Sequence, residues 1–336
     1  MKFFKNKMKV LCIGDLHIQS KNLIIFKKFQ HQILNYIENN SNNIDMIVIL
    51  GDILHTMDVL KTVCMNTALD FFNALLKFEK PIYIIVGNHD FIGPNEIMSK
   101  NHWMGSIHFH ELIEVVDNIV IDDNLLFLPY VPPGKFNQVL GNINLSNCKY
   151  IFCHQEFKDA VFEFAAVKSD KGDVWDEKNP TIISGHIHKK QWLQKNIYYV
   201  GTPYQTRFNE EQDKSVILLD TMSDKITEIF FQLPKLITLY EDIDTVENLL
   251  SYNFIIDNKY KIIITSSSLQ KTQLFVKNQI YKKLKKNTNV DFLFKYTKDI
   301  FLQKISPTYN FKDVLYKNIS SNPNLVSIYK EIFTEQ

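Results

Sequence analysis

Apolar runs of strand length alternate with longer amphipathic stretches through the first half of the chain. The runs at 10–13, 46–50 and 81–86 have the length of buried strands, and the stretches at 22–39 and 59–78 have the length of helices. In the first stretch, apolar residues recur at intervals of three and four, as on one face of a helix. Further strands are expected at 125–129, 150–153, 181–184, 198–200, 215–220 and 226–233. This order predicts an α/β sandwich with loops at its strand ends.

Pro234 follows the last of these strands and indicates a domain boundary. Beyond it we expect a strand at 260–265 and a helix at 271–286, with lysines on one helix face. The end of the chain holds two short amphipathic pieces that break at Pro323. The predicted domains are therefore a first domain at 1–233, a small α+β domain at 234–304 and a helical segment at 305–336.

The composition is that of a folded protein, with 336 residues, 45% hydrophobic and 22% charged. It excludes a disordered chain, a collagen and a coiled coil. No run approaches the roughly 18 apolar residues of a membrane span, and the apolar run at the start is too short for a signal peptide. The four cysteines show no CxxC spacing. We therefore expect reduced thiols and a place in the cytoplasm or nucleus of a cell or viral host, not secretion.

The net charge of +1 hides an uneven distribution. Eleven lysines against two aspartates give the segment 259–304 a charge of +9, so the rest of the chain carries −8. Such a basic segment can bind phosphates through counterion release, which makes Lys282, Lys283, Lys285 and Lys286 candidate DNA contacts. A solvated helix face in a lysine-rich chain is the alternative.

Five expected strands are followed directly by residues that can bind metals. These residues are Asp15 and His17, Asp52 and His55, Asn88 with His89 and Asp90, His154, and His186 with His188. A single His or Asp after a strand is most often a loop residue or a helix cap. Five such groups, on strand ends that meet at one edge of an α/β sheet, indicate one site. Four of the groups follow a glycine, where the backbone must turn sharply or approach a neighbour.

Carboxylate, imidazole and amide groups together suit Mn²⁺ or Fe²⁺, with Zn²⁺ as a further option. None of the cysteines has metal-ligand spacing, which argues against a closed structural zinc site. Seven candidate ligands are too many for one ion but suit two ions that share a carboxylate. Two such ions act as a clamp for phosphoryl transfer.

The motif series GDLH at 14–17, GDILH at 51–55, GNHD at 87–90, CH at 153–154 and GHIH at 185–188 resembles the calcineurin-like metallophosphoesterases. The resemblance implies a four-layer αββα sandwich, here with a small C-terminal capping domain. It also implies two divalent metal ions, of which Mn²⁺ is the main expectation and Fe²⁺ or Mg²⁺ are alternatives. It implies one ion held by Asp15, His17, Asp52 and His188, and a second by Asp52, Asn88, His154 and His186. It also implies that His89 protonates the leaving oxygen or stabilises phosphoryl charge, and that Asp90 orients His89.

Two features resemble the SbcD or Mre branch of DNA-end nucleases and its T-even phage counterpart. One is His55 three residues beyond Asp52, and the other is the Gly-Thr-Pro turn and following strand at 199–220. The resemblance implies an exo- or endonuclease in recombination, repair or replication, a second active-site histidine at His55, an SbcC-type coiled-coil ATPase partner and a homodimer. Gln155 and Glu156 depart from the small residues that are commoner after the fourth motif.

Several alternatives stay open at this point. The chain could be a metallophosphatase of small phosphoesters or phosphoproteins, or a scaffold that keeps the fold without the chemistry. The apolar residues of 313–333 suit either a partner-docking helix pair or a segment that folds back on its own core. The remaining residues of interest are interpreted as structural. Loop, helix or packing positions are expected for His31, His102, Trp103, His108, Phe109 and His110. Surface or capping positions are expected for Asp45, Asp58, Asp123 and Glu156.

Overall fold

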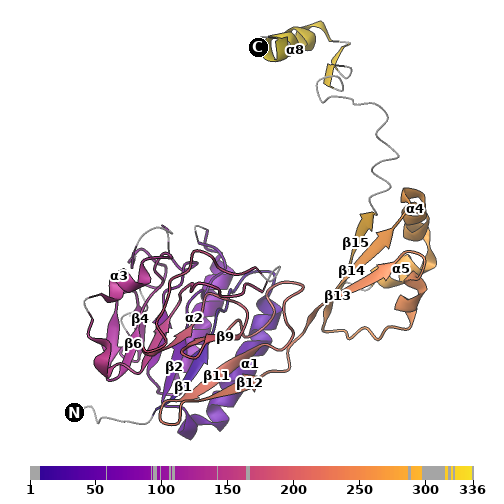
Figure 1. Cartoon of the computed structure of the whole chain (residues 1–336). Coiled ribbons are helices and arrows are strands. Elements are labelled where there is room, and N and C mark those ends of the chain that lie inside the picture. The colour runs from indigo at the N-terminus through magenta and orange to yellow at the C-terminus, as the bar shows by residue number, and fades with distance from the viewer. Residues whose placement is uncertain are drawn as a thin grey trace. The chain divides into compact units, whose positions relative to one another are not determined.

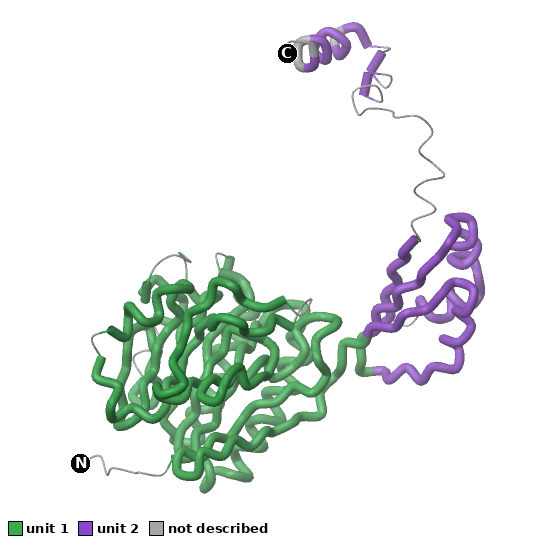
Figure 2. Tube along the Cα trace, viewed as in Figure 1, with its two compact units in different colours: residues 1–237, 257–259 green, residues 238–256, 260–336 purple. Residues whose placement is uncertain are grey.

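A computed structural model describes residues 8–57, 59–91, 93, 97–98, 100–105, 107, 110–141, 143–163, 167–286, 289–296, 315–316, 319–320 and 322–334. The chain forms two compact units, which are coloured separately in Figure 2. The first extends to Ile237 and includes Asp257–Lys259, and the second comprises Thr238–Ile256 and the residues from Tyr260 onwards. Asp58, His108, Phe109 and the whole segment 297–314 lie outside the described residues.

The first sheet of unit 1 has six strands in the order β12-β11-β1-β2-β3-β4. Their bounds are β1 Lys9–Ile13, β2 Met46–Ile49, β3 Ile82–Ile85, β4 Ile113–Val116, β11 Ser215–Asp220 and β12 Lys225–Phe230. The strands β1 to β4 pair in parallel, and β11 pairs antiparallel with both β1 and β12. All four residues of β2, MIVI, are buried, as expected for a parallel strand covered on both faces.

The second sheet has the order β5-β6-β7-β8-β10-β9. Its strands are β5 Val120–Asp122, β6 Leu125–Phe127, β7 Tyr150–Cys153, β8 Thr181–Ser184, β9 Gln191–Gln194 and β10 Ile197–Tyr199. The four central strands are parallel, and the edge strands β5 and β9 are antiparallel to their neighbours. Side chains of both sheets, among them Val48 and Phe152, form a buried cluster between them.

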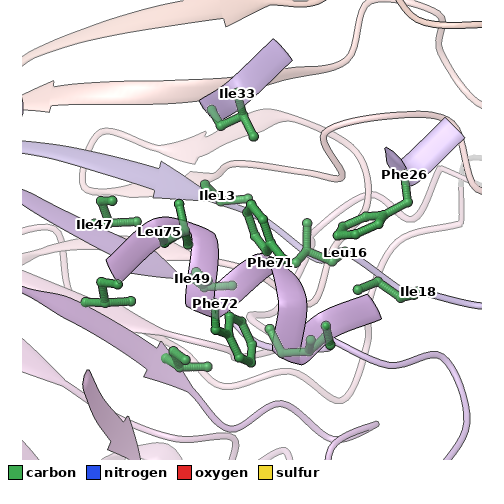
Figure 3. Packing of buried hydrophobic residues seen from close by; sticks show 14 of the residues in the cluster. Ile13, Leu16, Ile18, Phe26, Ile33, Ile47, Ile49, Phe71, Phe72 and Leu75 are labelled. Carbon is green, nitrogen blue, oxygen red and sulfur yellow. The ribbon is translucent and has the colours of Figure 1, made fainter. Parts of the chain in front are cut away.

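Helices cover the outer face of the first sheet, as Figure 1 shows. They are α1 (Leu23–Asn39) and α2 (Thr62–Leu76). Phe26 of α1 packs edge-on against Phe71 of α2 at 5.6 Å, and both lie near Leu16 beyond β1 (Figure 3). Burial of one such aromatic side chain contributes about 1.5–3 kcal/mol.

The outer face of the second sheet is covered by α3 (Phe136–Leu140) and by loops. Phe136 and Trp175 pack there in the third buried cluster. Short 3-10 helices lie at Ser41–Asn43 and Leu145–Asn147. The predicted α/β sandwich with two large sheets and outer helices is thus confirmed. Among the described residues, no helix combines the length and the hydropathy needed to cross a bilayer.

Unit 2 contains a three-stranded sheet in the order β13-β14-β15. Its elements are β13 Leu236–Asp242, a 3-10 helix at Val246–Leu250, β14 Lys259–Ser266, α4 Leu269–Lys277, α5 Gln279–Lys285, β15 Val290–Tyr296 and α8 Pro323–Thr334. The single helix expected at 271–286 is wrong. Asn278 has an extended backbone and its side chain accepts a hydrogen bond from Ile280 N, so it ends α4 and caps α5.

Five strands are present that the sequence pattern did not predict: β4, β5, β9, β13 and β15. All five lie at an edge of their sheet. An edge strand is covered less completely than a central one and needs fewer apolar residues, so its hydrophobic signal is weak. Most strands predicted from apolar runs, such as β1, β2 and β7, lie inside their sheets, whereas β12, which was also predicted, lies at an edge.

Candidate active site

Polar side chains that follow five strands of unit 1 lie close together in one site. β1, β2 and β3 are neighbours in the first sheet, and β7 and β8 are neighbours in the second. The residues that follow these strands are the seven candidate ligands together with His55, His89 and Asp90. The two sheets face each other across a shared cluster, so the carboxyl ends of their parallel strands meet. All ten side chains lie in this one site.

Asp52 lies at the centre, and its two carboxylate oxygens face different histidines. Its Oδ2 lies 3.4 Å from His17 Nε2, and its Oδ1 lies 3.3 Å from His154 Nε2. His17 Nε2 is also 2.8 Å from His188 Nε2. A carboxylate that faces two sets of ring nitrogens has the arrangement needed to bridge two cations.

Asn88 Oδ1 is the meeting point of the other histidines. It lies 3.0 Å from His154 Nε2 and 2.9 Å from His186 Nδ1, and those two ring nitrogens are 3.3 Å apart. His154 Nδ1 donates a hydrogen bond of 2.6 Å to Leu50 O. That bond fixes the ring so that Nε2 faces the cluster, as in metal sites where a backbone carbonyl orients the ligand.

Asp15 provides a test of whether this cluster fits a cation. Its Oδ1 accepts a hydrogen bond from His186 N at 2.9 Å. Its Oδ2 is buried, and no donor in the described part of the chain reaches it. A buried carboxylate oxygen without a partner is costly, and a divalent cation would satisfy it. The ligand atoms of Asp15, Asp52 and His154 lie within 4.8 Å of one another, as do those of His17, His55 and His89.

The backbone is shaped to bring these residues together. His17, Asp52 and His186 have φ values of 42°, 50° and 76°, in the left-handed region that ordinary residues rarely adopt. Such conformations concentrate at functional sites, where surrounding contacts maintain them. A Cβ on Gly87 would overlap both the Oδ1 and the backbone N of Asp52. This glycine therefore allows the β2 and β3 loops to touch.

We expect Gly87→Ala to weaken metal binding and lower the melting temperature, because the new methyl group displaces Asp52. The loss of stability should be about 1–3 kcal/mol. Manganese titration and thermal melting measure the two effects. Gly105→Ala is the matched control, since the nearest atom to its Cβ would be 4.0 Å away. Equal behaviour of the two variants would contradict the close packing at Gly87.

His55 and His89 lie beside the ligands and face the same cleft. Their rings are stacked at 5.6 Å with an angle of 17°, and His55 Nδ1 is 3.3 Å from His17 Nδ1. His89 Nδ1 lies 2.7 Å from the backbone oxygen of His55. A proton on Nδ1 would be held by this carbonyl, which leaves Nε2 of His89 as the atom available for proton transfer.

Asp90 was expected to orient His89, and it does so only indirectly. Among the described residues, no contact joins the Asp90 carboxylate to the His89 ring. Its oxygens accept hydrogen bonds from the backbone N atoms of Ile53 and Gly87 and from Trp103 Nε1. Asp90 thus secures the loop that carries His55, whose carbonyl orients His89. Burial and the nearby Asp52 charge raise the pKa of Asp90 to about 7.

The opposite charges of Asp52 and His154 stabilise each other at the centre of the site. Burial alone would raise the pKa of Asp52, but the His154 charge and hydrogen bond hold it well below its usual range. Burial would lower the pKa of His154, and the Asp52 carboxylate more than offsets this, raising it to about 9. Burial lowers the pKa of His17 despite Asp52. Burial, with the charges of His89 and Arg207, also lowers the pKa of His55.

Two carboxylates next to the GHIH motif were not predicted as site residues. Glu156 Oε2 lies 3.7 Å from His186 Nε2, and its Oε1 accepts a hydrogen bond from Ser169. Glu210 Oε1 lies 3.7 Å from His188 Nδ1. The interpretation of Glu156 as a surface or capping residue is wrong, because its side chain is only 17% exposed and faces a candidate ligand. Carboxylates in such positions orient histidine ligands.

A cleft of about 200 Å³ opens over the site. His55, His89 and His188 line it together with Phe162, Arg207 and Phe208. None of these last three residues was predicted as a site residue. The sequence held one indication of a role for Arg207 and Phe208. They lie in the segment 199–220, which resembles the SbcD or Mre nucleases in its turn and following strand.

Trp103, His102 and His31 contact residues other than the seven candidate ligands. Trp103 stacks on Phe72 at 6.3 Å, and its indole N–H donates a hydrogen bond to Asp90 Oδ1. His102 lies 3.3 Å from Asp117, and His31 lies beside Asn35 on α1. Lys282, Lys283, Lys285 and Lys286 belong to unit 2, at the end of α5 and directly after it, and are exposed.

The family model and the similar viral proteins both carry the name phosphoesterase. The model of a family described as Calcineurin-like phosphoesterase matches residues 8–219, a span that contains all seven candidate ligands. Two viral proteins named as phosphoesterases are similar in sequence. Protein 244L of invertebrate iridescent virus 6 is 36% identical over 288 residues, covering 81% of this chain and 98% of that protein. Protein 078R of invertebrate iridescent virus 3 is 29% identical over 346 residues, covering 98% of each.

Solved structures with a related shape include Pseudomonas putida nuclease MPE. The TM-score is 0.34 at 12% identity, covering 66% of this chain and 87% of that one. GAP50, described as the anchor in the inner membrane complex of Plasmodium, has a TM-score of 0.42 at 9% identity, with coverage of 68% and 90%. These two likenesses are too low to bear on function.

Proposed function

This chain belongs to the calcineurin-like phosphoesterase family, and we propose that it is a manganese-dependent nuclease that hydrolyses phosphodiester bonds of DNA. The observation that carries the proposal is the stacked pair His55 and His89 at the cleft, directly beside Asp52 and the candidate ligands. A phosphodiester must release a sugar oxygen, which leaves far more easily when a positioned imidazole protonates it.

The residues divide into two ligand sets that share Asp52. Asp15, His17, Asp52 and His188 would hold one cation, and Asp52, Asn88, His154 and His186 the other. Two divalent cations there would supply a water of lowered pKa and positive charge for the phosphoryl oxygens. Mn²⁺ suits this mixture of carboxylate, amide and imidazole ligands, with Fe²⁺ or Mg²⁺ as alternatives.

The protein's own side chains position the leaving group. The His55 carbonyl holds His89 Nδ1 at 2.7 Å, so Nε2 of His89 can donate a proton to the departing sugar oxygen. Asp90 keeps the His55 loop in place through Ile53 N at 3.0 Å. Glu210 and Glu156 face His188 and His186 and orient their rings.

The proposal extends to partners. We propose DNA contacts by four exposed lysines of unit 2, Lys282, Lys283, Lys285 and Lys286. An SbcC-type ATPase and a second copy of the chain are proposed from the family resemblance alone. Helix α8 exposes Leu325 and Ile328, three residues apart, to 45% and 51%, and such a stripe suits docking to a partner helix.

The test is cleavage by the purified protein of linear duplex DNA and of a single-stranded circle, with Mn²⁺, Mg²⁺ or a chelator. Hydrolysis of bis(p-nitrophenyl) phosphate and p-nitrophenyl phosphate is measured in parallel. We expect cleavage of at least one DNA with Mn²⁺, and turnover of the diester above that of the monoester. Turnover of the monoester without any DNA cleavage would favour the alternative, a metallophosphatase.

Manganese binding is expected to release a proton near neutral pH. His154 binds a cation only when Nε2 is unprotonated, yet in the metal-free protein its pKa is raised from 6.5 to about 9. Its ion pair with Asp52 therefore stabilises the metal-free protein below pH 6.5 and is lost as the pH rises through about 9. Manganese affinity should rise over that window by up to about tenfold per pH unit.

Calorimetry in two buffers that differ in ionisation enthalpy measures the released proton directly. Repeating the titration at a pH above about 9 provides the control, because His154 is then already neutral. An affinity that stays constant across the window would show that His154 does not lose a proton on binding.

A further inference from the structure

The chain contains 37 lysines and a single arginine, Arg207. That arginine lies in the segment between β10 and β11 and lines the cleft over the site, together with His55 and His89. Lysine and arginine both carry charge, but only the planar guanidinium presents a fork of N–H donors that matches phosphate oxygens in pairs. The one arginine of a lysine-rich chain is thus placed where a phosphate substrate must pass.

The turn that carries Arg207 is held firmly. Glu210 accepts hydrogen bonds of 2.7 Å from both the backbone N and the hydroxyl of Thr206. The amide of Gln205 binds the backbone oxygens of Glu210 and Leu236, and the Tyr204 hydroxyl donates to Leu16 O. The same Glu210 carboxylate faces His188, so the turn is tied to the candidate ligands.

Other cations beside the turn already have partners. Lys189 pairs with Glu211 at 2.9 Å, Lys190 with Glu228 at 2.5 Å and Lys214 with Glu163 at 2.6 Å. The Arg207 guanidinium has no hydrogen bond or ion pair within the part of the chain that the structure describes, and its side chain is exposed. It is the cation on this wall of the cleft that a substrate can engage.

The position of Arg207 points to a phosphate other than the one that is cleaved. The candidate ligands His17, His186 and His188 line the cleft. Asp15, Asp52 and His154 are at most 2% exposed, so cations held by these residues would bind the reacting phosphate at the buried end of the cleft. Arg207 is exposed on the wall. Phe162 and Phe208 also line the cleft, and aromatic rings stack on nucleic-acid bases.

We propose that Arg207 binds a second phosphate of the substrate, next to the scissile one, and so selects a polynucleotide strand over an isolated phosphoester. The proposal rests on the proposed phosphodiesterase function and deepens it by naming the substrate class. A lysine at this position would keep the charge but lose the paired hydrogen bonds.

The test compares Arg207→Ala and Arg207→Lys with the wild type on two substrates, each with Mn²⁺. A single-stranded thymidine oligonucleotide carries neighbouring phosphates, whereas bis(p-nitrophenyl) phosphate carries one. We expect Arg207→Ala to lower kcat/KM on the oligonucleotide about tenfold to a hundredfold, mainly through KM, with a smaller loss for Arg207→Lys. The loss of kcat/KM on the small diester should be at least about fivefold smaller than the loss on the oligonucleotide in Arg207→Ala.

Lys195→Ala is the matched control for loss of one charge, since Lys195 is 86% exposed in the turn between β9 and β10. It should leave both activities unchanged. An equal loss on both substrates in Arg207→Ala would mean that the residue contacts the scissile phosphate or stabilises the fold. No loss on either would remove it from substrate binding. Each of these results overturns the proposal.

A binding measurement separates this proposal from the nuclease proposal itself. Calorimetry with Mn²⁺ compares thymidine 3′,5′-bisphosphate with thymidine 5′-monophosphate, and it needs no turnover. If the wild type fails to cleave any DNA, the nuclease proposal fails. Arg207 is still supported if the bisphosphate binds at least about tenfold more tightly in the wild type and this advantage disappears in Arg207→Ala. An advantage that persists in the variant overturns it.

Discussion

Replacement of Asp52 by asparagine is expected to lower manganese-dependent hydrolysis by on the order of a thousandfold or more. The Asp52 oxygens face His17 on one side and His154 on the other, so loss of one negative oxygen weakens both cation positions. The charge stabilisation supplied by such cations is several kcal/mol, and each 1.36 kcal/mol is about tenfold in rate. The measurements are kcat/KM on bis(p-nitrophenyl) phosphate and the number of manganese ions bound.

Asparagine is a suitable replacement because it tolerates the left-handed conformation that Asp52 adopts at φ 50°. Asp123→Asn is the matched control, since Asp123 has a similar φ of 55° and is exposed. We expect that control to keep full activity and metal content. Full manganese occupancy together with wild-type activity in Asp52→Asn would contradict the bridging role.

His89→Leu is expected to lower DNA cleavage about a hundredfold to ten-thousandfold while both manganese ions stay bound. The His89 ring lies 4.9 Å from the His17 ring and is anchored by the His55 carbonyl, which suits a proton donor beside the metal ligands. The loss should be smaller on bis(p-nitrophenyl) phosphate, because nitrophenolate departs without needing a proton. Comparing the two substrates therefore reports the proton transfer itself.

Metal content decides whether His89 has this role. His17, His55 and His89 offer ring nitrogens within 4.8 Å of one another, so a variant that loses manganese would identify His89 as a ligand instead. His31→Leu serves as the control for loss of an imidazole, since His31 is exposed on α1. It should leave both cleavage and metal content unchanged.

The sequence pattern located the buried strands and most of the residues of the site. The runs that become β1, β2, β3, β7 and β8 are apolar because both faces of a central strand are covered. The polar residues that follow them therefore stood out as strand-end groups. An edge strand such as β9, QWLQ, was not predicted, because two of its four residues are polar and none of the four is buried. The break at Asn278 was also missed, because one capping residue leaves the lysine and apolar pattern intact.

What the sequence by itself determined is therefore local: which runs become central strands and which side chains follow them. The tertiary structure alone decided which of those side chains touch. Asp15 meets His186 N across 171 residues, and Arg207 reaches the cleft of His55 and His89 from a turn beyond β10. It also assigned Asp90 to the His55 loop and Glu156 to His186. Hydrophobic periodicity reports burial along one element, whereas such contacts depend on how separate sheets pack and how their loops turn.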